Sequence, residues 1–561
     1  MHWIFKPKPN PKEVEKIAKE LSINKALASL LVQRGVNTFA KAKEFFRPSL
    51  SNLHNPFLMK DMDLAVARIE LALNRNENIL IYGDYDVDGT TATSLMYCYL
   101  KEQYPNVATY IPDRYQEGYG VSFQGVNFAY ENNFSLIIAL DCGIKAVDKV
   151  NYAKQKGIDF IICDHHKPGI EVPKAFAILN PKQKDCNYPY TELCGCGIGF
   201  KLAQALEQQK NYSIKNLIPY LDLVAIAIAA DIVPITGENR VLAYYGLQVI
   251  NSSPRNGVKA LFYEMQKNQL SITDVVFIIA PRINAAGRIK HGNFAVSLLI
   301  ETDFKTALQK AEQIEKFNSD RKKLDSSITK DALLQIEQNN EQHKFSTVVY
   351  NKNWHKGVIG IVASRLIKSY HRPTVVFTKS SEKLVGSARS VNDFDIYAAL
   401  EKCSTFIEQF GGHKYAAGLS VSFEQYESFK SKFEQVVAQS IDKEYLIPQV
   451  LIDSELNLED INPKFYRILK QMAPFGPQNM NPVFYTKNIK GNNTGKKVGA
   501  DSSHLKLNIT SQDCKKAYGA IGFELGNKIK KTHENFDIVY NISENTWNGI
   551  TSIQLVLKDL K

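Results

Sequence analysis

The segment 78–93 constrains the fold of this chain more than any other, because a strand-like run leads through a charged loop into a helix-like run. Residues 79–82 are apolar or favour strands, and Asp84, Asp86 and Asp88 follow at every second position. Three carboxylates this close repel one another when ionised, and a divalent cation with oxygen ligands relieves that repulsion. The segment predicts a metal site at the end of a strand. A solvated acidic turn is the alternative.

Length and composition set the broad class of the protein. The chain has 561 residues, 44% of them hydrophobic, which is enough for three or four domains with proper cores. The net charge of +11 permits polyanionic partners. Cys194 and Cys196 lack a second pair at zinc-ligand spacing, so we expect reduced thiols used in packing. The run 223–230 is too short to span a bilayer and the N-terminus lacks a signal-peptide pattern, so we expect a cytoplasmic protein.

Apolar runs alternate with helical patterns after residue 62, which predicts an α/β fold with a doubly wound parallel sheet. Ligands of such sheets bind beyond the carboxyl ends of the strands. Asp141 and the Asp164–His166 segment each follow such a run, and Asp231 follows the apolar run 224–230, which periodicity assigns to neither strand nor helix. We therefore expect these side chains to meet at one edge. The expected strands are 79–82, 107–111, 136–140, 160–163 and 175–179.

Further patterns divide the rest of the chain. A charged stretch from 301 to 343 without Pro or Gly predicts one long connecting helix, and strands at 347–350 and 374–377 with a helix between them predict a second α/β domain. Short strand-like runs after Lys443 predict an all-β barrel. The expected division is a helical N-terminal extension (1–50), a catalytic domain (51–300), the connecting helix (301–345), the second α/β domain (346–442) and the barrel (443–561).

Two glycine-rich segments of the second α/β domain, 386–390 and 411–418, suit phosphate binding. Glycine lets backbone N–H groups approach an anion, and Arg389 can donate two parallel hydrogen bonds to phosphate oxygens. Ordinary turns, or an ion pair of Arg389 with Asp393 or Asp395, are the alternatives. The segments 281–288 and 355–360 are expected to take part in the same binding.

The C-terminal region is basic. Ten lysines lie between Lys487 and Lys531 against three acids, with Tyr485, Tyr518 and Phe523 among them. This combination favours a groove for a single-stranded backbone with aromatic stacking platforms. A merely solvated basic face is the alternative.

The order Gly-Asp-Tyr-Asp-Val-Asp-Gly, Leu-Asp-Cys-Gly, Asp-His-His-Lys-Pro, Ala-Asp-Ile-Val-Pro and Gly-Gly-His resembles the DHH phosphoesterase family. The segments Pro-Arg-Ile-Asn-Ala-Ala-Gly-Arg (281–288) and Pro-Phe-Gly-Pro (474–477) are similar to its bacterial exonucleases that degrade single-stranded DNA from the 5′ end in recombination and repair. The resemblance runs from about residue 53 to the C-terminus. It implies a DHH domain, a DHH-associated domain and a C-terminal oligonucleotide-binding (OB) barrel.

The resemblance also implies the chemistry of the site. Two divalent ions, Mn²⁺ or Mg²⁺, would be bridged by Asp141, with Asp84 and Asp86 completing one shell and Asp88, His165 and Asp231 the other. Tyr82 stands where the wider family has a histidine, so the ligand set of the first ion stays open. Asp164 is expected to orient an imidazole. The implied catalytic residues are Asp141, His166 and Arg282, and the implied substrate-binding residues are Arg114, Arg282, Arg288, His355, Ser387, Arg389, Gly411, Gly412 and His413.

The expected function is therefore metal-dependent exonucleolytic release of 5′-mononucleotides from single-stranded DNA. By resemblance, a single-strand-binding protein and a helicase are candidate partners, and a monomer without membrane association is expected. One alternative is a phosphoesterase of very short oligonucleotides or cyclic dinucleotides, which would not need a basic barrel. Another is a non-catalytic replication scaffold, against which the intact acidic motifs argue.

Overall fold

A computed structural model describes residues 1–265, 267, 269–490, 494–510 and 516–561. The chain divides into two compact units. The smaller consists of Met1–His2, Ala285–His291 and Glu312–Gln449, and the larger consists of Trp3–Asn284, Gly292–Ala311 and Val450–Lys561. Among the described residues, no helix is both long and apolar enough to cross a membrane.

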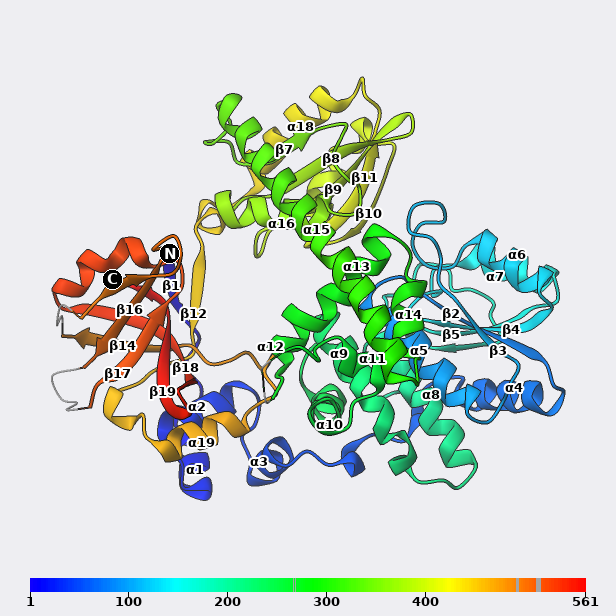
Figure 1. The fold of residues 1–561 in the computed structure, drawn as a ribbon, viewed down its shortest axis with the longest axis horizontal. Coiled ribbons are helices and arrows are strands. Elements are labelled where there is room, and N and C mark those ends of the chain that lie inside the picture. The colour runs from blue at the N-terminus through cyan, green and yellow to red at the C-terminus, as the bar shows by residue number, and fades with distance from the viewer. Residues whose placement is uncertain (266, 268, 491–493, 511–515) are drawn as a thin grey trace. The chain divides into compact units, whose positions relative to one another are not determined.

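The larger unit contains the predicted parallel sheet (Figure 1), and its order is β3-β2-β4-β5-β6. All four pairings are parallel, with Ile81 beside Thr109 on one side and Ile138 on the other. The predicted doubly wound fold is confirmed, and the strand order changes direction at β2 and β4. The strands are β2 (Asn78–Gly83), β3 (Val107–Tyr110), β4 (Phe134–Leu140), β5 (Asp159–Cys163) and β6 (Ala177–Leu179).

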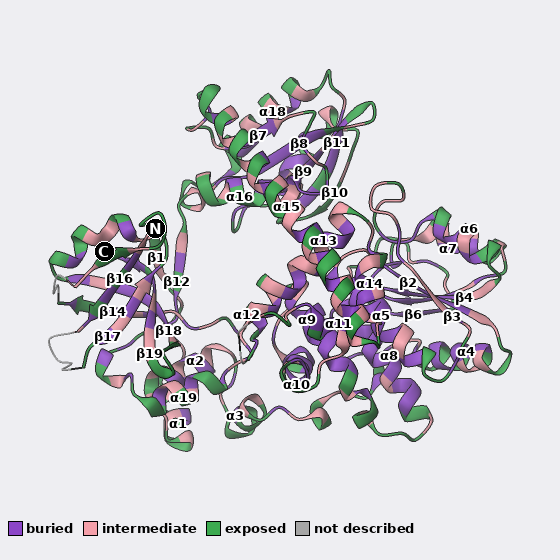
Figure 2. Cartoon of the chain, viewed as in Figure 1, coloured by how far each residue is buried: buried purple, intermediate pink, exposed green. Residues whose placement is uncertain are grey.

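Helices cover both faces of this sheet, so its central strands are buried (Figure 2). One face carries α6 (Phe123–Glu131) and α7 (Val147–Gln155), which pack on β4 and β5. The other carries α4 (Met62–Asn74), α5 (Val87–Lys101) and α8 (Gly195–Gln209). Near-continuous apolar strands such as Leu-Ile-Ile-Ala-Leu are typical of a sheet buried on both sides.

The ambiguous run before Asp231 is a helix, α9 (Leu221–Ala230), whose residues are all buried except Ala230 at its end. It packs against α5, α8 and α10, so it is buried on every side and has no amphipathic period. The helices that follow are α10 (Gly237–Ser252), α11 (Asn256–Ala260), α12 (Ile272–Asp274), the π-helical turn η4 (Val275–Ile279), α13 (Ala280–Ile289) and α14 (Asn293–Leu299).

The smaller unit is the second α/β domain. The predicted connecting helix is α15 (Phe304–Gln338), and the sheet order is β10-β11-β9-β8-β7, with only β7 and β8 parallel. Both glycine-rich segments contribute to strands here. The elements are β7 (Thr347–Tyr350), α16 (Ile359–Tyr370), β8 (Thr374–Ser380), β9 (Lys383–Arg389), α17 (Ile396–Glu401), β10 (Gln409–His413), β11 (Ala416–Val421) and α18 (Tyr426–Ser440).

The C-terminal region is a seven-stranded sheet of order β13-β14-β18-β19-β17-β16-β15. The expected barrel is not closed: in the described residues β13 and β15 are the two ends of this order, and β12 (Gln449–Ile452) pairs with β1 (His2–Phe5) instead. The strands are β13 (Ser454–Glu455), β14 (Phe484–Ile489), β15 (Lys496–Val498), β16 (His504–Ile509), β17 (Tyr518–Gly522), β18 (Phe536–Trp547) and β19 (Ile550–Leu560), and α19 (Pro463–Gln471) precedes β14.

The N-terminal helices share one core with this C-terminal sheet. Ile17, Leu27 and Leu31 belong to the same buried cluster as Phe465 and Tyr540. Their helices are α1 (Pro11–Leu21), α2 (Lys25–Gln33) and α3 (Phe39–Phe46).

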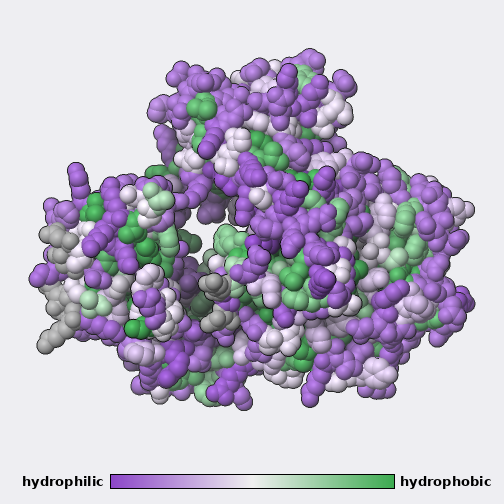
Figure 3. All heavy atoms as spheres, in the orientation of Figure 1, coloured by the Kyte–Doolittle hydropathy of each residue, from purple (hydrophilic) through white to green (hydrophobic). Residues whose placement is uncertain are grey.

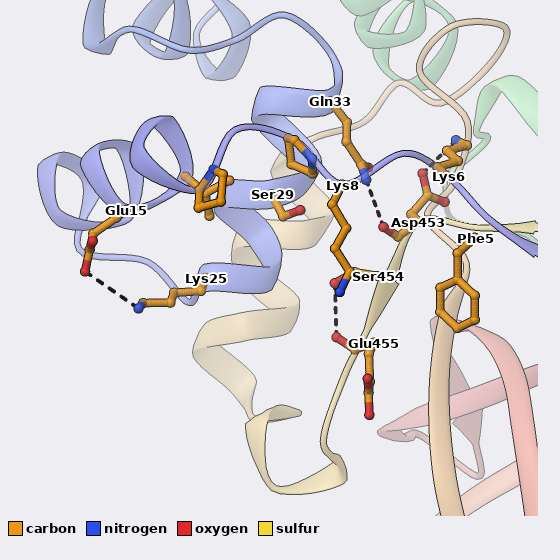
Figure 4. A pocket seen from close by; sticks show the side chains of 13 residues that line it. Phe5, Lys6, Lys8, Glu15, Lys25, Ser29, Gln33, Asp453, Ser454 and Glu455 are labelled. Carbon is orange, nitrogen blue, oxygen red and sulfur yellow. Dashed lines mark hydrogen bonds and ion pairs between the residues drawn. The ribbon is translucent and has the colours of Figure 1, made fainter.

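Polar contacts join the N-terminal segment to the same sheet. Lys6 Nζ lies 2.7 Å from Asp453 Oδ1, and Gln33 Nε2 donates to the carbonyl of Asp453 (Figure 4). Arg240 of α10 donates to the carbonyls of Phe45, Met472 and Ala473. The start and the end of the chain are thus packed together.

Short helical turns complete the secondary structure, and they are η1 (Leu50–Asn52), η2 (Pro56–Leu58), η3 (Ile214–Tyr220), η5 (Ser404–Phe406), η6 (Lys443–Leu446), η7 (Leu458–Asp460) and η8 (Gly526–His533). On the face drawn in Figure 3, hydrophilic residues predominate and hydrophobic ones are scattered among them. Every cysteine within the described residues is a free thiol, as expected.

Candidate metal centre and phosphate-binding residues

The loop between β2 and α5 holds the first acidic motif in a tight turn. Asp86 caps α5 and accepts a hydrogen bond from Gly89 N at 3.0 Å. A Cβ on Gly89 would lie 2.4 Å from the Asp84 carbonyl oxygen, so only glycine permits the loop to fold back on the helix. The local sequence therefore brings the three aspartates to the carboxyl end of β2.

Asp88 is fixed by the start of α8. Gly195 N and Cys196 N both donate to its carboxylate, each at 2.7 Å. A Cβ on Gly195 would lie 2.5 Å from Asp141 Cβ, so this glycine lets α8 approach both acids. The pair Cys194 and Cys196 was expected only to pack, and both thiols are buried. Sequence reasoning missed that the backbone beside them binds a carboxylate.

His165 lies among three carboxylates. Its Nε2 is 3.2 Å from Asp141 Oδ1, 3.6 Å from Asp231 Oδ2 and 3.8 Å from Asp88 Oδ2. Asp141 follows β4 in a left-handed conformation with φ of 60°. Two sets of ligand atoms lie close enough to hold a cation: Asp141, His165 and His166, and Asp88, His165 and Asp231. The four strand and helix ends singled out from sequence therefore do meet.

Asp84 and Asp86 lie beside these two sets rather than within them. Asp84 is fully buried, and its Oδ1 accepts from Gly120 N at 3.3 Å. Tyr82 is buried and donates to the Gly120 carbonyl at 3.1 Å, so its hydroxyl anchors this loop. The assignment of Asp84 and Asp86 to one ion's shell stays a prediction.

Asp164 orients an imidazole, as expected. Its Oδ1 lies 2.7 Å from His166 Nδ1 and accepts the His166 N–H, and its Oδ2 accepts from Ile144 N. On the other side of the ring, Tyr119 Oη lies 3.1 Å from His166 Nε2. Sequence reasoning missed Tyr119, which lies five residues after the predicted substrate-binding residue Arg114.

Burial and mutual repulsion raise the pKa values of the carboxyl groups. The pKa of Asp84 rises to about 8 and that of Asp88 to about 7, in each case through burial and then the charge of Asp86. Burial and the charges of Asp88 and Asp86 raise the pKa of Asp231 to about 8. The pKa of Asp141 is raised well above its ordinary value by burial and by Asp88. Such a set binds protons or a cation more readily than it stays fully ionised.

The two histidines are shifted in opposite directions. Burial and the neighbouring His166 lower the pKa of His165 to about 3, which leaves its imidazole neutral, as a metal ligand must be. Burial opposes protonation of His166, but its hydrogen bond to Asp164 and nearby acidic charges outweigh burial and raise its pKa. The pair therefore offers one ligand and one proton donor.

Unpaired buried atoms provide a test of whether a cation fits here. Within the described residues, Asp84 Oδ2, Asp141 Oδ1 and His165 Nε2 are buried without a hydrogen-bond partner. Buried polar atoms are normally satisfied, and carboxylate oxygens with imidazole nitrogen suit Mn²⁺ or Mg²⁺. The residues present fit a divalent metal centre.

Two predicted arginines also belong to the larger unit. The Arg114 guanidinium stacks over the Tyr85 ring at 4.7 Å, next to the acidic loop. Arg282 donates to the Ile278 carbonyl at 2.7 Å, in α13 just after the π-helical turn η4. Arg114 thus lies beside the metal ligands, whereas the catalytic role of Arg282 stays a prediction.

In the smaller unit, Ser387 and Arg389 lie at the start of α16. Arg389 Nη1 donates to Ser387 Oγ at 3.1 Å, and Asp395 caps α17 through Ala398 N. A Cβ on Gly360 would lie 2.9 Å from both Ser387 Oγ and Arg389 Nη2. α16 begins without a side-chain cap, so its N–H groups remain suited to an anion.

The remaining predicted phosphate-binding residues flank this group or lie on an edge strand. Arg288 donates to the Gly357 carbonyl at 3.1 Å, and Gly357 N donates to His355 Nδ1. Gly411, Gly412 and His413 form the exposed edge strand β10, where Gly412 has φ of 148°. The contact of these three residues with substrate stays a prediction.

The basic C-terminal face is only partly as expected. Phe523 is exposed, but Tyr518 is buried and donates to the Ile461 carbonyl, so it is no stacking platform. The amphipathic period of β17 turns this tyrosine inward. Lys496 and Lys506 are exposed and directly opposite each other on β15 and β16. Lys515 lies outside the described residues.

Three segments of the sequence match models of known protein families. Residues 78–228 match the N-terminal domain of the DHH family, residues 343–439 match the DHHA1 domain and residues 452–559 match the RecJ OB domain. The fold and the acidic, histidine-containing centre are therefore those of a DHH protein.

Relatives narrow the assignment further. The single-stranded-DNA-specific exonuclease RecJ of Bacillus subtilis is 36% identical, over 100% of this chain and 70% of its own length, and that of Haemophilus influenzae is 31% identical over 91% and 92%. The chain belongs to the RecJ family. A solved structure of RecJ in complex with Mn²⁺ from Thermus thermophilus is 25% identical, with a TM-score of 0.86, over 100% of this chain and 79% of that one. An exonuclease RecJ bound to manganese is 30% identical, with a TM-score of 0.61, over 70% and 97%.

Proposed function

We propose that this protein is a metal-dependent exonuclease that hydrolyses single-stranded DNA in the 5′-to-3′ direction to 5′-mononucleotides, in DNA recombination and repair. The observation that carries the proposal is the position of His165 Nε2 within 3.2–3.8 Å of carboxylate oxygens from Asp141, Asp231 and Asp88. Relatives named as single-stranded-DNA-specific exonucleases, and RecJ structures with Mn²⁺ and Mg²⁺, support the substrate and the cofactor.

The proposed cofactors are two divalent ions, Mn²⁺ or Mg²⁺. The residues that would hold them are Asp84, Asp86, Asp88, Asp141, His165 and Asp231. When bound, such ions lower the pKa of water and neutralise charge on phosphoryl oxygens.

The side chains around the proposed metal ligands hold the ring of His166 in place and supply a proton. Asp164 fixes the ring of His166 through Nδ1 and raises its pKa, so Nε2 carries a proton that it can donate to a phosphoryl oxygen. Tyr119 holds that Nε2 in place before substrate binds. Neutral His165 contributes a nitrogen lone pair and no positive charge.

A second group of residues reads the 5′ end. We assign the terminal phosphate to Ser387, Arg389 and the first N–H groups of α16. A terminal phosphate carries more charge than an internal diester, so a guanidinium fork gains affinity for it. The expected result is faster digestion of 5′-phosphorylated than of 5′-hydroxyl strands, with most of the difference lost in Arg389→Ala. Lys368→Ala, which removes an exposed cation in the last turn of α16, is the matched control. A preference that survives Arg389→Ala would place end recognition elsewhere.

Digestion of end-labelled single strands tests the main proposal. With Mg²⁺ or Mn²⁺ added, a 5′ label should appear at once as mononucleotide, while a 3′ label should stay in progressively shorter strands. EDTA should stop both reactions. Simultaneous shortening from the 3′ end, or activity only on di- and trinucleotides, would favour the short-oligonucleotide phosphoesterase.

Three finer points extend the proposal. We propose a division at 50, 300, 345 and 442 into N-terminal extension, DHH domain, connecting helix, DHH-associated domain and OB domain, which limited proteolysis can test. We propose a cytoplasmic monomer, testable by fractionation and light scattering. A single-strand-binding protein and a helicase are proposed partners, testable by pull-down with the purified proteins.

A further inference from the structure

A small cavity adjoins His166, and the proposed function assigns it no ligand. Its volume is about 180 Å³, and it lies where the loop after β4 leads into α7. His166 and Tyr119 line it together with Lys145 and Lys149. The same imidazole therefore faces both the metal ligands and this cavity.

The cavity contains more positive than negative charge. Lys145 is exposed and Lys149 half-exposed, and neither forms an ion pair with any described residue. Lys149 Nζ lies 5.3 Å from the ring centroid of Phe123. Asp164 also lines the cavity, but its oxygens already accept hydrogen bonds from His166 and Ile144 N.

The N-terminus of α7 adds a second, independent preference for an anion. The helix is nine residues long, its N-cap is Ala146, and no side chain accepts its first N–H groups. Unsatisfied N–H groups and the helix dipole favour a negative ligand at this end. Asp148 in the first turn would compete for them, but it is exposed and does not line the cavity.

We propose that this cavity, defined by Lys145, Lys149 and the N-terminus of α7, binds the phosphate of the DNA strand that adjoins the scissile phosphate. The inference rests on the proposed nuclease function and deepens it. His166 lines the cavity and also contacts the metal ligands, so a strand with one phosphate at the metal centre can place its neighbour here. Holding that neighbour fixes the scissile bond in register for hydrolysis.

Binding without metal tests the cavity separately from catalysis. In EDTA, the Lys145→Gln/Lys149→Gln variant should bind a fluorescent oligothymidylate about fivefold or more weakly, and the slope of log K against log salt should shrink by about 0.7 for each phosphate that no longer binds a lysine. The Lys154→Gln/Lys174→Gln variant, which removes two exposed lysines outside the cavity, should match wild type. Lys145→Arg/Lys149→Arg should restore most of the affinity.

The outcomes separate this inference from the proposed function. Wild type that digests single strands, together with a glutamine variant that binds with wild-type affinity and salt slope, overturns the cavity assignment alone. Wild type that leaves single strands intact in Mn²⁺ and Mg²⁺ overturns the proposed function. Unchanged oligonucleotide affinity with weaker inhibition by 5′-dAMP assigns the cavity to the released nucleotide and also overturns the strand assignment.

Discussion

At the scale of single residues, Asp141 combines a functional contact with an unusual backbone conformation. It has φ of 60°, which asparagine and aspartate tolerate better than other side chains. Its N–H still bonds to the Cys163 carbonyl at 2.8 Å. Asparagine can therefore replace it without backbone strain while removing the charge that a cation needs.

Asp141→Asn should reduce the nuclease rate by at least about a hundredfold, because the carboxylate proposed to bridge the ions is lost. In EDTA its melting temperature should equal or exceed that of wild type, since one of several mutually repelling carboxylates is gone. Scanning fluorimetry and a single-strand digestion assay measure the two effects. A folded variant with near-native rate would contradict the metal assignment.

The raised carboxyl pKa values predict how metal-free stability depends on pH. Asp84, Asp88 and Asp231 have pKa values of about 7–8 in the folded chain against an ordinary value of 3.8, so the folded state holds extra protons. This stabilisation is fully present below about pH 4 and is lost progressively as pH rises, until it is gone above the folded pKa values of about 7–8. In EDTA the melting temperature should therefore fall between pH 5 and pH 8 and level off above that.

Mg²⁺ should reduce that fall, because a cation replaces the protons. Melting curves at four pH values, with and without Mg²⁺, measure the difference. Asp231→Asn, which lacks one titrating group, should show a smaller pH dependence in EDTA. An equal decline in the presence and absence of Mg²⁺ would show that general alkaline destabilisation, rather than these carboxylates, is responsible.

The residues of the candidate site could be predicted from the sequence, but most of the groups that hold them in place could not. Parallel strands bring their carboxyl ends to one edge, so Asp141 and His165 could be expected to meet before any coordinates were known. The N–H groups of Gly195 and Cys196 have no residue-type signature, and Tyr119 reaches His166 only through the path of its loop. Contacts that depend on loop conformation leave no periodic pattern in the local sequence, so they could not be predicted from it.

At the scale of elements, periodicity separated strands from helices wherever one side of the element faces solvent. α9 is buried on all sides, so its sequence carries no period and could be read either way. Most strands of the C-terminal sheet were predicted, but their expected closure into a barrel was wrong for the described residues, because closure depends on which edge strands pair. β12 pairs with a strand from the other end of the chain.

The β15–β16 pair suggests a direct test of the basic face. Lys496 and Lys506 are directly opposite each other, and like charges in that arrangement destabilise a sheet unless an anion lies between them. Lys496→Gln/Lys506→Gln should weaken binding to long single strands and reduce the salt slope, with thermal stability unchanged or slightly increased. Lys464→Gln, on α19, is a control for loss of a C-terminal lysine. Unchanged binding would identify β15–β16 as a solvated face.

At the scale of the whole molecule, the shared core of the N-terminal helices and the C-terminal sheet makes truncation at residue 443 a poor test of DNA binding. Such a truncation would expose Leu27, Leu30 and Leu31 on α2. Reduced activity would then report aggregation as much as weaker binding of DNA.

Leu31→Ala should destabilise the C-terminal sheet by about 2–5 kcal/mol, although the substitution lies more than four hundred residues earlier in the chain. The expected signature is faster hydrogen exchange in β14 and β18, with β2 and β4 less affected. Lys19→Ala, exposed on α1, should leave exchange unchanged. If Leu31→Ala accelerates exchange only in α1 and α2, the two ends of the chain are energetically independent.

The packing of the two chain ends also has a consequence during synthesis. Trp3 Nε1 donates to Asp559 Oδ2 across 556 positions of sequence, and β1 pairs with β12. The N-terminal helices leave the ribosome before the DHH domain, whereas the C-terminal sheet that covers their apolar side emerges only after it. The DHH domain can fold while translation continues, whereas α1 and α2 keep exposed leucines for most of that time. Ribosome-bound nascent chains should therefore stay sensitive to protease near the N-terminus until the C-terminal sheet is released.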